Sequence, residues 1–313
     1  MEYRRLGKTD LQVSVLSFGG SSLGGVFRAV EEAEAIRTVH TAADLGINFI
    51  DTSPFYGITR AEAVLGKALR EVSRDRFYIA TKAGRYGEAE FDFSARRVTA
   101  SLNESLTRLG LDYVDLIQCH DIEYGSLDQV VQETLPALRR LQASGKARFV
   151  GITALPLSAF RYVTARADVD TILSYCHYSL NDTALDSLIP ELAAKDTGII
   201  SASPLSMGLL TNRGAPAWHP APEEIRETCR RAAAHCRAKG VDIAQLALQF
   251  SLSNPRIHTT LVGTASPENL RKNVAWLAGP MDTELLAEVQ SILQPVHDRT
   301  WQTGRVENNY RPV

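Results

Sequence analysis

The sequence predicts an α/β protein in which eight parallel strands close into a single (β/α)8 TIM barrel, with a short N-terminal β-hairpin and C-terminal helices. Short apolar runs alternate with amphipathic helical patterns along the chain, and they form eight strand–helix units, the number that closes such a barrel. A length of 313 residues suits one large barrel. No low-complexity linker or short repeat divides the chain, so we expect one domain over residues 1–313.

The predicted elements follow in chain order. Gly7 and Lys8 favour the turn of a hairpin that leads into the apolar run at 13–20. Further strands are expected where apolar runs end at turn residues, at 48–51, 77–82, 113–120, 147–153, 171–178, 198–204 and 259–263. Helical periodicity is found at 31–45, 61–71, 94–109, 127–143, 156–165, 182–195, 223–239, 243–252, 267–278 and 282–293.

Helix boundaries show local signals. Ser94 is the type of residue that caps a helix N-terminus, and Gly145 is a typical stop after the helix at 127–143. The segment 206–222 is rich in Gly, Pro, Asn and Trp, which indicates a long loop that could act as a lid or cofactor strap. The tail from residue 295 has no clear periodicity.

The composition narrows the class of function. A formal net charge of -2 gives no field that would attract nucleic acid or an anionic membrane. No apolar run is long enough to span a bilayer, and the N-terminus lacks the apolar core of a signal peptide. The 4 cysteines form no CxxC pair, so we expect no metal site, no redox motif and a cytoplasmic location.

An open doubly wound sheet with a dinucleotide site is the main competing fold. The run GGSSLGG follows the first predicted barrel strand, but it is out of register with GxGxxG. No acidic residue ends the next strand in the position that would bind a ribose. We therefore interpret these glycines as a tight loop on the barrel face that carries the strand C-termini.

Four polar residues end, or directly follow, three consecutive predicted strands: Asp51, Tyr56, Lys82 and His120. In a parallel barrel these strand ends gather on one face, where barrel enzymes place their active sites. A Lys beside a Tyr would favour the phenolate, an Asp would keep that Lys charged, and a neutral His could donate to a substrate oxygen. Such a cluster suits proton transfer at a carbonyl or alcohol during hydride transfer, which requires a cofactor, usually a nicotinamide.

The segments DTSPFYG, ATK and LIQCH around these residues resemble the catalytic segments of the aldo-keto reductases, and ASPLSMGLL and LVGTASPENLRKN extend the resemblance along nearly the whole chain. The resemblance implies a (β/α)8 enzyme that uses NADPH or NADH. Tyr56 would be the general acid/base, Lys82 and Asp51 would tune it, and His120 would orient the substrate. The stretches FDFSARRV, QCHDIEYGSLDQVV and LSYCHYSLND resemble the branch that oxidises the C1 hydroxyl of cyclic aldoses of the L-galactose, L-fucose or D-arabinose type to aldonolactones.

The resemblance also implies a set of cofactor-binding residues: Thr153, Tyr175, Ser203, Leu205, Met207, Gly208, Leu209, Gly263, Thr264, Ser266, Asn269 and Asn273. Three positions depart from the family pattern. Thr153-Ala154 replaces the Ser-Asn pair that holds the carboxamide, Tyr175 replaces a Gln, and Ala202 replaces the Tyr that stacks on the nicotinamide. We expect Tyr175 to occupy the space that Ala202 vacates and to supply the stacking face.

The segment 263–273 indicates the cofactor preference. Members of the family that bind NADPH place basic residues where this chain has Gly263 and Asn269. Arg271 and Lys272 lie nearby, but neighbouring positions of a helix point in different directions. Loss of a bidentate Arg removes a strong phosphate contact, so NAD is favoured over NADP.

Hydroxyl-reading contacts to the sugar are expected from loop residues on the same face: Ser53, Phe55, Asp121, Glu123, Tyr124 and Trp301. Three alternatives stay open: a general NADPH-dependent aldehyde or ketone reductase, a non-catalytic nucleotide-binding subunit like those of potassium channels, and an aldolase with Lys82 as Schiff-base nucleophile. The near-neutral composition favours a monomer.

Overall fold

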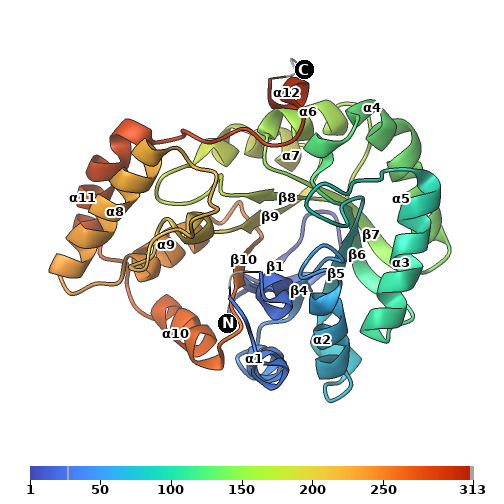
Figure 1. Ribbon diagram of the computed structural model, residues 1–313, viewed down its shortest axis with the longest axis horizontal. Helices are drawn as coiled ribbons and strands as arrows, with labels where there is room; N and C mark the ends of the chain where they lie inside the picture. The colour runs from blue at the N-terminus through green and yellow to red at the C-terminus, as the bar shows by residue number, and fades with distance from the viewer. Residues whose placement is uncertain (27, 311–313) are drawn as a thin grey trace.

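The computed structural model describes residues 1–26 and 28–310 and confirms the predicted barrel. Eight parallel strands close into a ring in the order β10-β3-β4-β5-β6-β7-β8-β9, surrounded by helices (Figure 1). The strands are β3 (Leu16–Gly19), β4 (Phe49–Asp51), β5 (Tyr78–Ala83), β6 (Val114–Cys119), β7 (Ala147–Ala154), β8 (Thr171–Tyr175), β9 (Gly198–Ala202) and β10 (Thr259–Gly263).

The predicted N-terminal hairpin closes one end of this barrel. It consists of β1 (Tyr3–Arg5) and β2 (Gln12–Ser14), which pair in antiparallel fashion. Leu6, Leu11 and Val13 are fully buried and pack with inward-facing residues of the barrel strands. The Lys8 amide donates to the Asp196 carbonyl just before β9, so the hairpin covers the end where the strands begin. The opposite end, where the strands finish, is left for the loops.

The outer layer is helical. Its longer helices are α1 (Glu32–Asp44), α2 (Arg60–Leu69), α3 (Ala95–Leu109), α5 (Leu135–Ala143), α6 (Leu157–Thr164), α8 (Glu223–Ala238), α9 (Ile243–Leu252), α10 (Pro267–Leu277) and α11 (Thr283–Leu293). Ser94 caps α3 as predicted, because its side chain accepts from the Arg97 amide. Among the described residues, no helix is long and apolar enough to cross a membrane.

The structure corrects three predicted elements. The run at 13–20 is two strands, because Val15 separates the hairpin strand β2 from the barrel strand β3. The helix at 127–143 is α4 (Leu127–Gln129), a π-helical turn and α5, and Pro136, which lacks an amide hydrogen, lies at the start of α5. The helix at 182–195 is reduced to a 3-10 turn and the short α7 (Ile189–Ala193).

The C-terminal tail is ordered by contacts that its sequence did not indicate. It ends in α12 (Val306–Asn309), which lies against α6 beside the strand C-termini (Figure 1). The Asn308 side chain is 1% exposed and donates to the carbonyls of Glu123 (2.8 Å) and Gly125 (3.0 Å). The tail therefore covers the loop that follows β6.

Candidate active site

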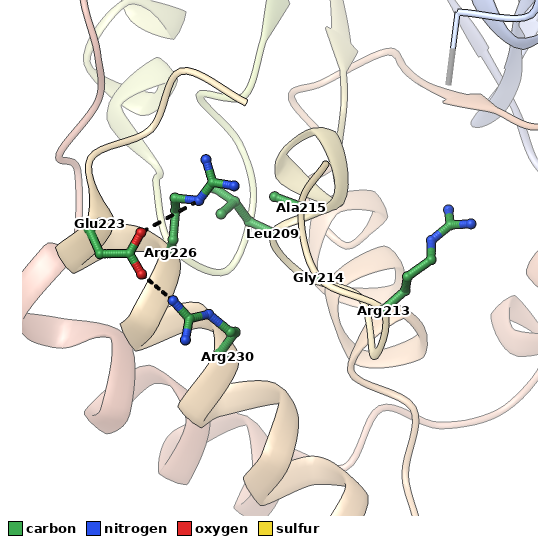
Figure 2. A pocket seen from close by; sticks show the side chains of 7 residues that line it. All are labelled: Leu209, Arg213, Gly214, Ala215, Glu223, Arg226 and Arg230. Carbon is green, nitrogen blue, oxygen red and sulfur yellow. Dashed lines mark hydrogen bonds and ion pairs between the residues drawn. The ribbon is translucent and has the colours of Figure 1, made fainter. Parts of the chain in front are cut away.

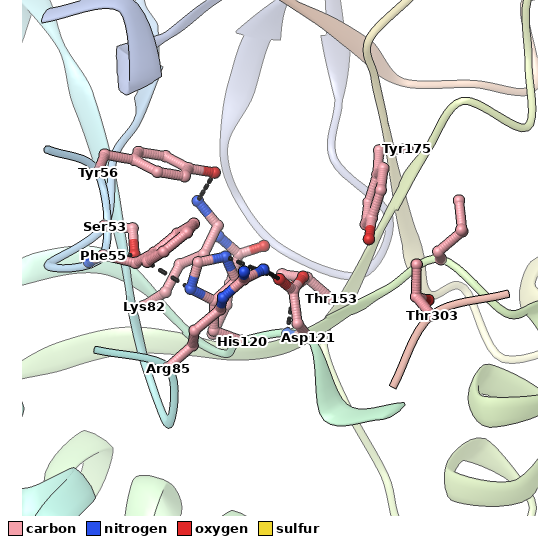
Figure 3. A network of polar contacts seen from close by, with 12 residues as sticks. Ser53, Phe55, Tyr56, Lys82, Arg85, His120, Asp121, Thr153, Tyr175 and Thr303 are labelled. Carbon is pink, nitrogen blue, oxygen red and sulfur yellow. Dashed lines mark hydrogen bonds and ion pairs between the residues drawn. The ribbon is translucent and has the colours of Figure 1, made fainter. Parts of the chain in front are cut away.

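The C-terminal ends of β4, β5 and β6 bring the side chains of Asp51, Tyr56, Lys82 and His120 together, and Figure 3 shows the last three. In the parallel sheet Asp51 is paired with Ala80 of β5, and Lys82, two residues further along β5, is paired with Gln118 of β6. The polar residues therefore lie near the C-terminal ends of three adjacent strands. The Lys82 ammonium contacts an Asp51 carboxylate oxygen, the Tyr56 hydroxyl at 3.2 Å and the Thr52 carbonyl at 2.9 Å. Asp51, Tyr56 and Lys82 thus form one hydrogen-bonded group.

Lys82 is held in its charged form. Burial alone would lower its pKa, but Asp51 and Tyr56 outweigh that effect and raise it above the ordinary value. Asp51 is itself anchored, since Gln118 Nε2 donates to its second carboxylate oxygen at 2.7 Å. A charged, ion-paired Lys82 is a poor nucleophile, which argues against a Schiff-base aldolase.

Tyr56 is a protonated phenol near neutral pH in this structure. Burial raises the pKa of its hydroxyl, and the adjacent Lys82 charge works in the opposite direction without overcoming it. The Lys82 ammonium also lies 4.7 Å from the centre of the Tyr56 ring. Tyr56 therefore holds its hydroxyl proton at neutral pH, and it can accept a proton only as the phenolate, which the Lys82 charge favours.

His120 is neutral. Burial lowers its pKa to about 3, and its ring stands perpendicular to the Tyr56 ring with the two centroids 5.8 Å apart. Its Nδ1 lies 3.1 Å from the Ser53 hydroxyl, and Ser53 is 0% exposed. The hydroxyl of Ser53, a predicted sugar contact, is thus directed toward His120.

Asp121, the next residue, is paired with an arginine that the sequence did not reveal. The Arg85 guanidinium lies 2.6 Å from an Asp121 carboxylate oxygen and stacks 3.8 Å from the centre of the Phe55 ring. Burial would raise the pKa of Asp121, but His120 and Arg85 lower it below its ordinary value. Asp121 is therefore a charged hydrogen-bond acceptor beside His120.

Tyr124, another predicted sugar contact, stacks on Phe91 with their centroids 4.4 Å apart. The Arg85 guanidinium lies 5.2 Å from the Tyr124 ring. Tyr124 thus belongs to the aromatic surroundings of Arg85.

Glu123 is a fully buried carboxyl beside these groups. Burial, followed by the nearby Asp121 charge, raises its pKa to about 8, so it is mostly uncharged at neutral pH. Its Oε1 accepts from the Leu155 amide at 3.2 Å and the Thr303 hydroxyl at 3.0 Å. Its Oε2 is buried without a hydrogen-bond partner among the described residues. Glu123 thus ties the tail to the loop after β6.

Two predicted cofactor residues lie close to this network. Tyr175 is paired directly opposite Ala202 in the β8–β9 register, and its hydroxyl lies 3.4 Å from the Glu123 carboxyl (Figure 3). Because the two residues are adjacent, the large Tyr175 ring lies beside the small Ala202 side chain, as the predicted filling of that space by Tyr175 requires. The Thr153 hydroxyl is already engaged, because it accepts from the Asp121 amide at 2.9 Å and lies 3.2 Å from the Asp121 carboxylate.

The loop after β9 carries strained backbone where a cofactor strap was predicted. Ser203, Ser206 and Met207 all have positive φ, at 59°, 45° and 51°, and Gly208 follows at 106°. Non-glycine residues in this region are uncommon and often mark functional sites. Leu205 and Leu209, which were predicted to bind the cofactor, flank the same turn at Ser206–Gly208.

Buried contacts hold this strap. The Ser206 hydroxyl donates to the Asn181 side chain at 2.6 Å, and His219 Nε2 lies 3.1 Å from the Ser206 carbonyl. Trp301 packs edge-on against His219 with their centroids 5.0 Å apart. Trp301, a predicted sugar contact, thus lies in the support of the strap.

A cavity of about 200 Å³ is lined by residues of the strap and of α8 (Figure 2). One of its arginines, Arg226, holds the loop. Arg226 donates to the carbonyls of His219 at 2.9 Å and Pro216 at 3.0 Å, and Glu223 lies between Arg226 and Arg230. This cavity is part of the connection between the strap and α8.

The segment after β10 provides a helix N-terminus. Ser266 caps α10 and accepts from the Asn269 amide at 3.3 Å, and the Thr264 hydroxyl accepts from the Ser266 amide at 3.2 Å. Gly263 is exposed, and a Cβ there would lie 3.2 Å from the Ser22 hydroxyl. Asn273 lies one turn further along α10.

The two basic residues of α10 point elsewhere, as predicted. Arg271 reaches Thr41 of α1 at 3.5 Å, and Lys272 pairs with Asp242 at 3.2 Å.

Together these parts fit a dinucleotide. A strained strap at β9 and a capped helix N-terminus at β10 lie on neighbouring strands, and helix N-termini favour phosphate groups. The polar cluster lies at β4–β6 on the same barrel face. Among the described residues, no group of three or more His, Cys, Asp or Glu could hold a metal ion.

Sequence reasoning missed Arg85, Gln118, Thr303 and Asn308. Gln118 had a usable signal, because it lies two residues before His120 in a strand and alternation puts both side chains on the same side. Arg85 had only its position three residues after Lys82. Thr303 and Asn308 gave no local signal, since their partner Glu123 is far away in the chain.

Comparisons with known proteins agree with this architecture. Residues 15–294 match the model of the aldo/keto reductase family. The chain is 53% identical to an L-galactose dehydrogenase of Arabidopsis thaliana over 98% of this chain and 99% of that protein. It is 31% identical to a D-threo-aldose 1-dehydrogenase of Pseudomonas sp over 89% and 94% of the two chains. The holo form of an aldo-keto reductase from Bacillus halodurans superposes with a TM-score of 0.78 at 26% identity, covering 99% of this chain and 100% of the other. By sequence and by structure, the chain belongs to the aldo/keto reductase family.

Proposed function

We propose that this protein is a nicotinamide-dependent aldose 1-dehydrogenase that oxidises the C1 hydroxyl of a cyclic aldose to the aldonolactone. The observation that carries the proposal is the contact of the charged Lys82 with both Asp51 and the Tyr56 hydroxyl (3.2 Å). The identity to an L-galactose dehydrogenase over nearly the full length of both chains supports the sugar class.

In this proposal Tyr56 first loses its own proton to solvent, and the resulting phenolate accepts the proton of the anomeric hydroxyl. The bound nicotinamide supplies the hydride acceptor for the hydrogen on C1. Lys82 favours the phenolate by its charge, and Asp51 keeps Lys82 protonated. Neutral His120 donates a hydrogen bond to the same substrate oxygen and orients it.

Asp121 and Arg85 are proposed to read the hydroxyls that neighbour C1. Asp121 Oδ2 lies 3.6 Å from His120 Nε2, too far for a hydrogen bond with it, so it remains an acceptor beside the reacting position. Arg85 keeps this buried carboxylate charged. A charged acceptor distinguishes a sugar hydroxyl from a hydrogen more strongly than a neutral one.

We propose NAD as the preferred cofactor. Nicotinamide cofactors are used throughout the aldo/keto reductase family. Gly263 and Asn269 offer no charge to a 2′-phosphate, and Arg271 and Lys272 are turned toward α1 and Asp242. Thr264, Ser266 and the N-terminus of α10 suit the neutral ribose and the pyrophosphate.

The proposed molecule is a cytoplasmic monomer that acts on a small sugar. Its 4 cysteines are all unpaired and buried, which suits a reducing compartment. Among the described residues, the exposed large apolar side chains include Met1 and Tyr3 near the N-terminus, Ile58 and Trp218 in loops, and Val306 and Tyr310 in the tail.

A spectrophotometric assay tests the proposal. Purified protein is mixed with L-galactose, L-fucose or D-arabinose, each with NAD and with NADP, and absorbance at ~340 nm is followed. The expected result is reduction of NAD with at least one sugar and faster turnover than with NADP. Carbonyl reduction by NADPH without sugar oxidation would instead identify a general aldehyde or ketone reductase. No turnover in either direction would favour a non-catalytic nucleotide-binding protein.

A further inference from the structure

Ser53 links the turn that carries Tyr56 to the ring of His120. Ser53 lies two residues after the end of β4. Its carbonyl accepts a hydrogen bond from the Tyr56 amide at 3.1 Å. Its hydroxyl oxygen accepts from the Phe55 amide at 3.1 Å and lies 3.1 Å from His120 Nδ1. Both Ser53 (0% exposed) and His120 (3% exposed) are shielded from water.

The hydrogen-bond inventory of Ser53 allows two arrangements. A hydroxyl has one proton and two acceptor sites, and a neutral imidazole carries its proton on one nitrogen only. In the first arrangement Ser53 donates to Nδ1, and the His120 proton is on Nε2. In the second, Nδ1–H donates to Ser53, which then accepts twice, and its own buried proton has no acceptor among the described contacts. Buried donors without acceptors are rare, so the first arrangement is favoured.

The other side of the ring favours the same arrangement. His120 Nε2 faces Asp121 Oδ2 at 3.6 Å. That carboxylate also receives Arg85 at 2.6 Å, which holds it in the charged form. A lone pair on Nε2 would be repelled by the carboxylate, whereas an N–H there is attracted to it. Two independent contacts, one at each ring nitrogen, therefore place the proton on Nε2.

We propose that Ser53 is a positioning residue that fixes the tautomer of His120, so that Nε2–H points toward the substrate oxygen. The nitrogen that carries the proton is set by the hydrogen bond at the other nitrogen, and here Ser53 makes that bond. The same hydroxyl orders the turn before Tyr56, so the donor and the acid/base are positioned by one residue. The identity of the acceptor, a sugar oxygen, rests on the proposed function; the tautomer does not.

The direct test is the long-range ¹H–¹⁵N spectrum of the full-length protein with ¹⁵N-labelled histidine rings, recorded without cofactor or substrate. The His120 signals are assigned by their loss in His120→Gln. We expect an unprotonated Nδ1 and a protonated Nε2 in the wild type, and a shift toward the other tautomer in Ser53→Ala. A wild-type spectrum with the proton on Nδ1 would overturn the proposal, as would a Ser53→Ala spectrum with an unchanged His120 tautomer.

Kinetics and a matched control separate positioning from mere packing. Ser53→Ala should lower kcat about three- to tenfold, the range expected for loss of one neutral hydrogen bond. Ser53→Thr, which keeps the hydroxyl, should restore both the tautomer and most of kcat. Ser251→Ala is the control, because Ser251 lies in α9, is 0% exposed and donates at 3.1 Å to the Tyr178 carbonyl in the loop after β8. If both alanine variants lose thermal stability and the His120 tautomer is unchanged in Ser53→Ala, Ser53 contributes only to packing.

The tautomer test stands even if the proposed function fails. If no sugar is oxidised, the spectra of the wild type and of Ser53→Thr still decide the position of the proton. If Ser53→Ala does not fold, the same two spectra suffice, because the proposal requires both to show Nε2 protonated.

Discussion

Replacement of Glu123 by glutamine should remove a pH dependence of stability that this buried carboxyl creates. Glu123 is 0% exposed, and its pKa is raised from 4.5 to about 8 by burial and by Asp121. The native state therefore keeps a proton that the unfolded chain loses. The stability that this proton provides is complete below pH 4.5 and is lost as the pH rises through about 8.

The size of the expected stability loss follows from the difference between the pKa values of Glu123 in the unfolded and the native state. The free energy of unfolding changes by about 1.4 kcal/mol per pH unit wherever the native state holds one extra proton. From pH 5 to pH 8 the wild type should lose about 4 kcal/mol from this group alone. Glutamine keeps the acceptor for Leu155 and Thr303 but has no charge to gain, so Glu123→Gln should lack this loss. Its amide nitrogen replaces the unpartnered Oε2 and should cost about 1–3 kcal/mol at low pH.

The measurement is urea denaturation of both proteins at several pH values from 5 to 8 at constant ionic strength. The difference between the two free energies isolates Glu123 from all other titrating groups. Glu88→Gln, at an exposed position, is the control and should run parallel to the wild type. If the Glu123→Gln and wild-type curves also stay parallel, Glu123 is ionised in the native state and the description of this site is wrong.

Three further predictions concern the reaction itself. Tyr56→Phe should lower kcat for sugar oxidation by about 10²- to 10⁴-fold while nicotinamide binding, followed by fluorescence, is retained; an unchanged kcat would remove Tyr56 from the chemistry. Arg85→Leu leaves the Asp121 carboxylate buried and unpaired, so the free energy of unfolding measured in urea should fall by about 3 kcal/mol. The KM for the sugar should rise in the same variant. An unchanged KM would exclude Asp121 as a sugar contact. Asn269→Arg should raise the affinity for NADP relative to NAD about tenfold in parallel titrations; equal affinities before and after would show that position 269 does not face the phosphate.

The barrel could be predicted because each signal for it is local. Strand and helix periods, caps such as Ser94 and stops such as Gly145 depend on a few neighbouring residues, and the structure confirms them. The strand prediction was wrong where one apolar run pairs with two different strands. Residues 13–20 read as one strand, but Val15 divides a hairpin strand from a barrel strand, and only tertiary pairing distinguishes them.

The polar cluster could be predicted because parallel strand ends collect on one face. Asp51, Lys82 and His120 are at or next to the ends of three neighbouring strands, and the topology brings them together. Arg85 was missed because it lies in a loop, where an arginine is usually solvated, and its stacking on Phe55 appears only in three dimensions.

The tail and the charge state of Glu123 could not be predicted for a related reason. Asn308 contacts the Glu123 carbonyl across 185 positions, and a Cβ on Gly304 would lie 2.3 Å from that carbonyl oxygen. These contacts bury Glu123, and burial is what changes its pKa. The sequence shows that a carboxyl group is present, but its solvent exposure depends on tertiary contacts that the local sequence does not specify.

The central claim is that hydride leaves C1 of an aldose in this site. The most direct test uses L-galactose deuterated at C1, incubated with NAD and the purified protein, with mass spectrometry of the reduced cofactor and of the sugar product. We expect deuterium in the reduced nicotinamide and an unlabelled lactone as the product. Deuterium retained in an oxidised sugar, or an unlabelled reduced cofactor, would contradict it.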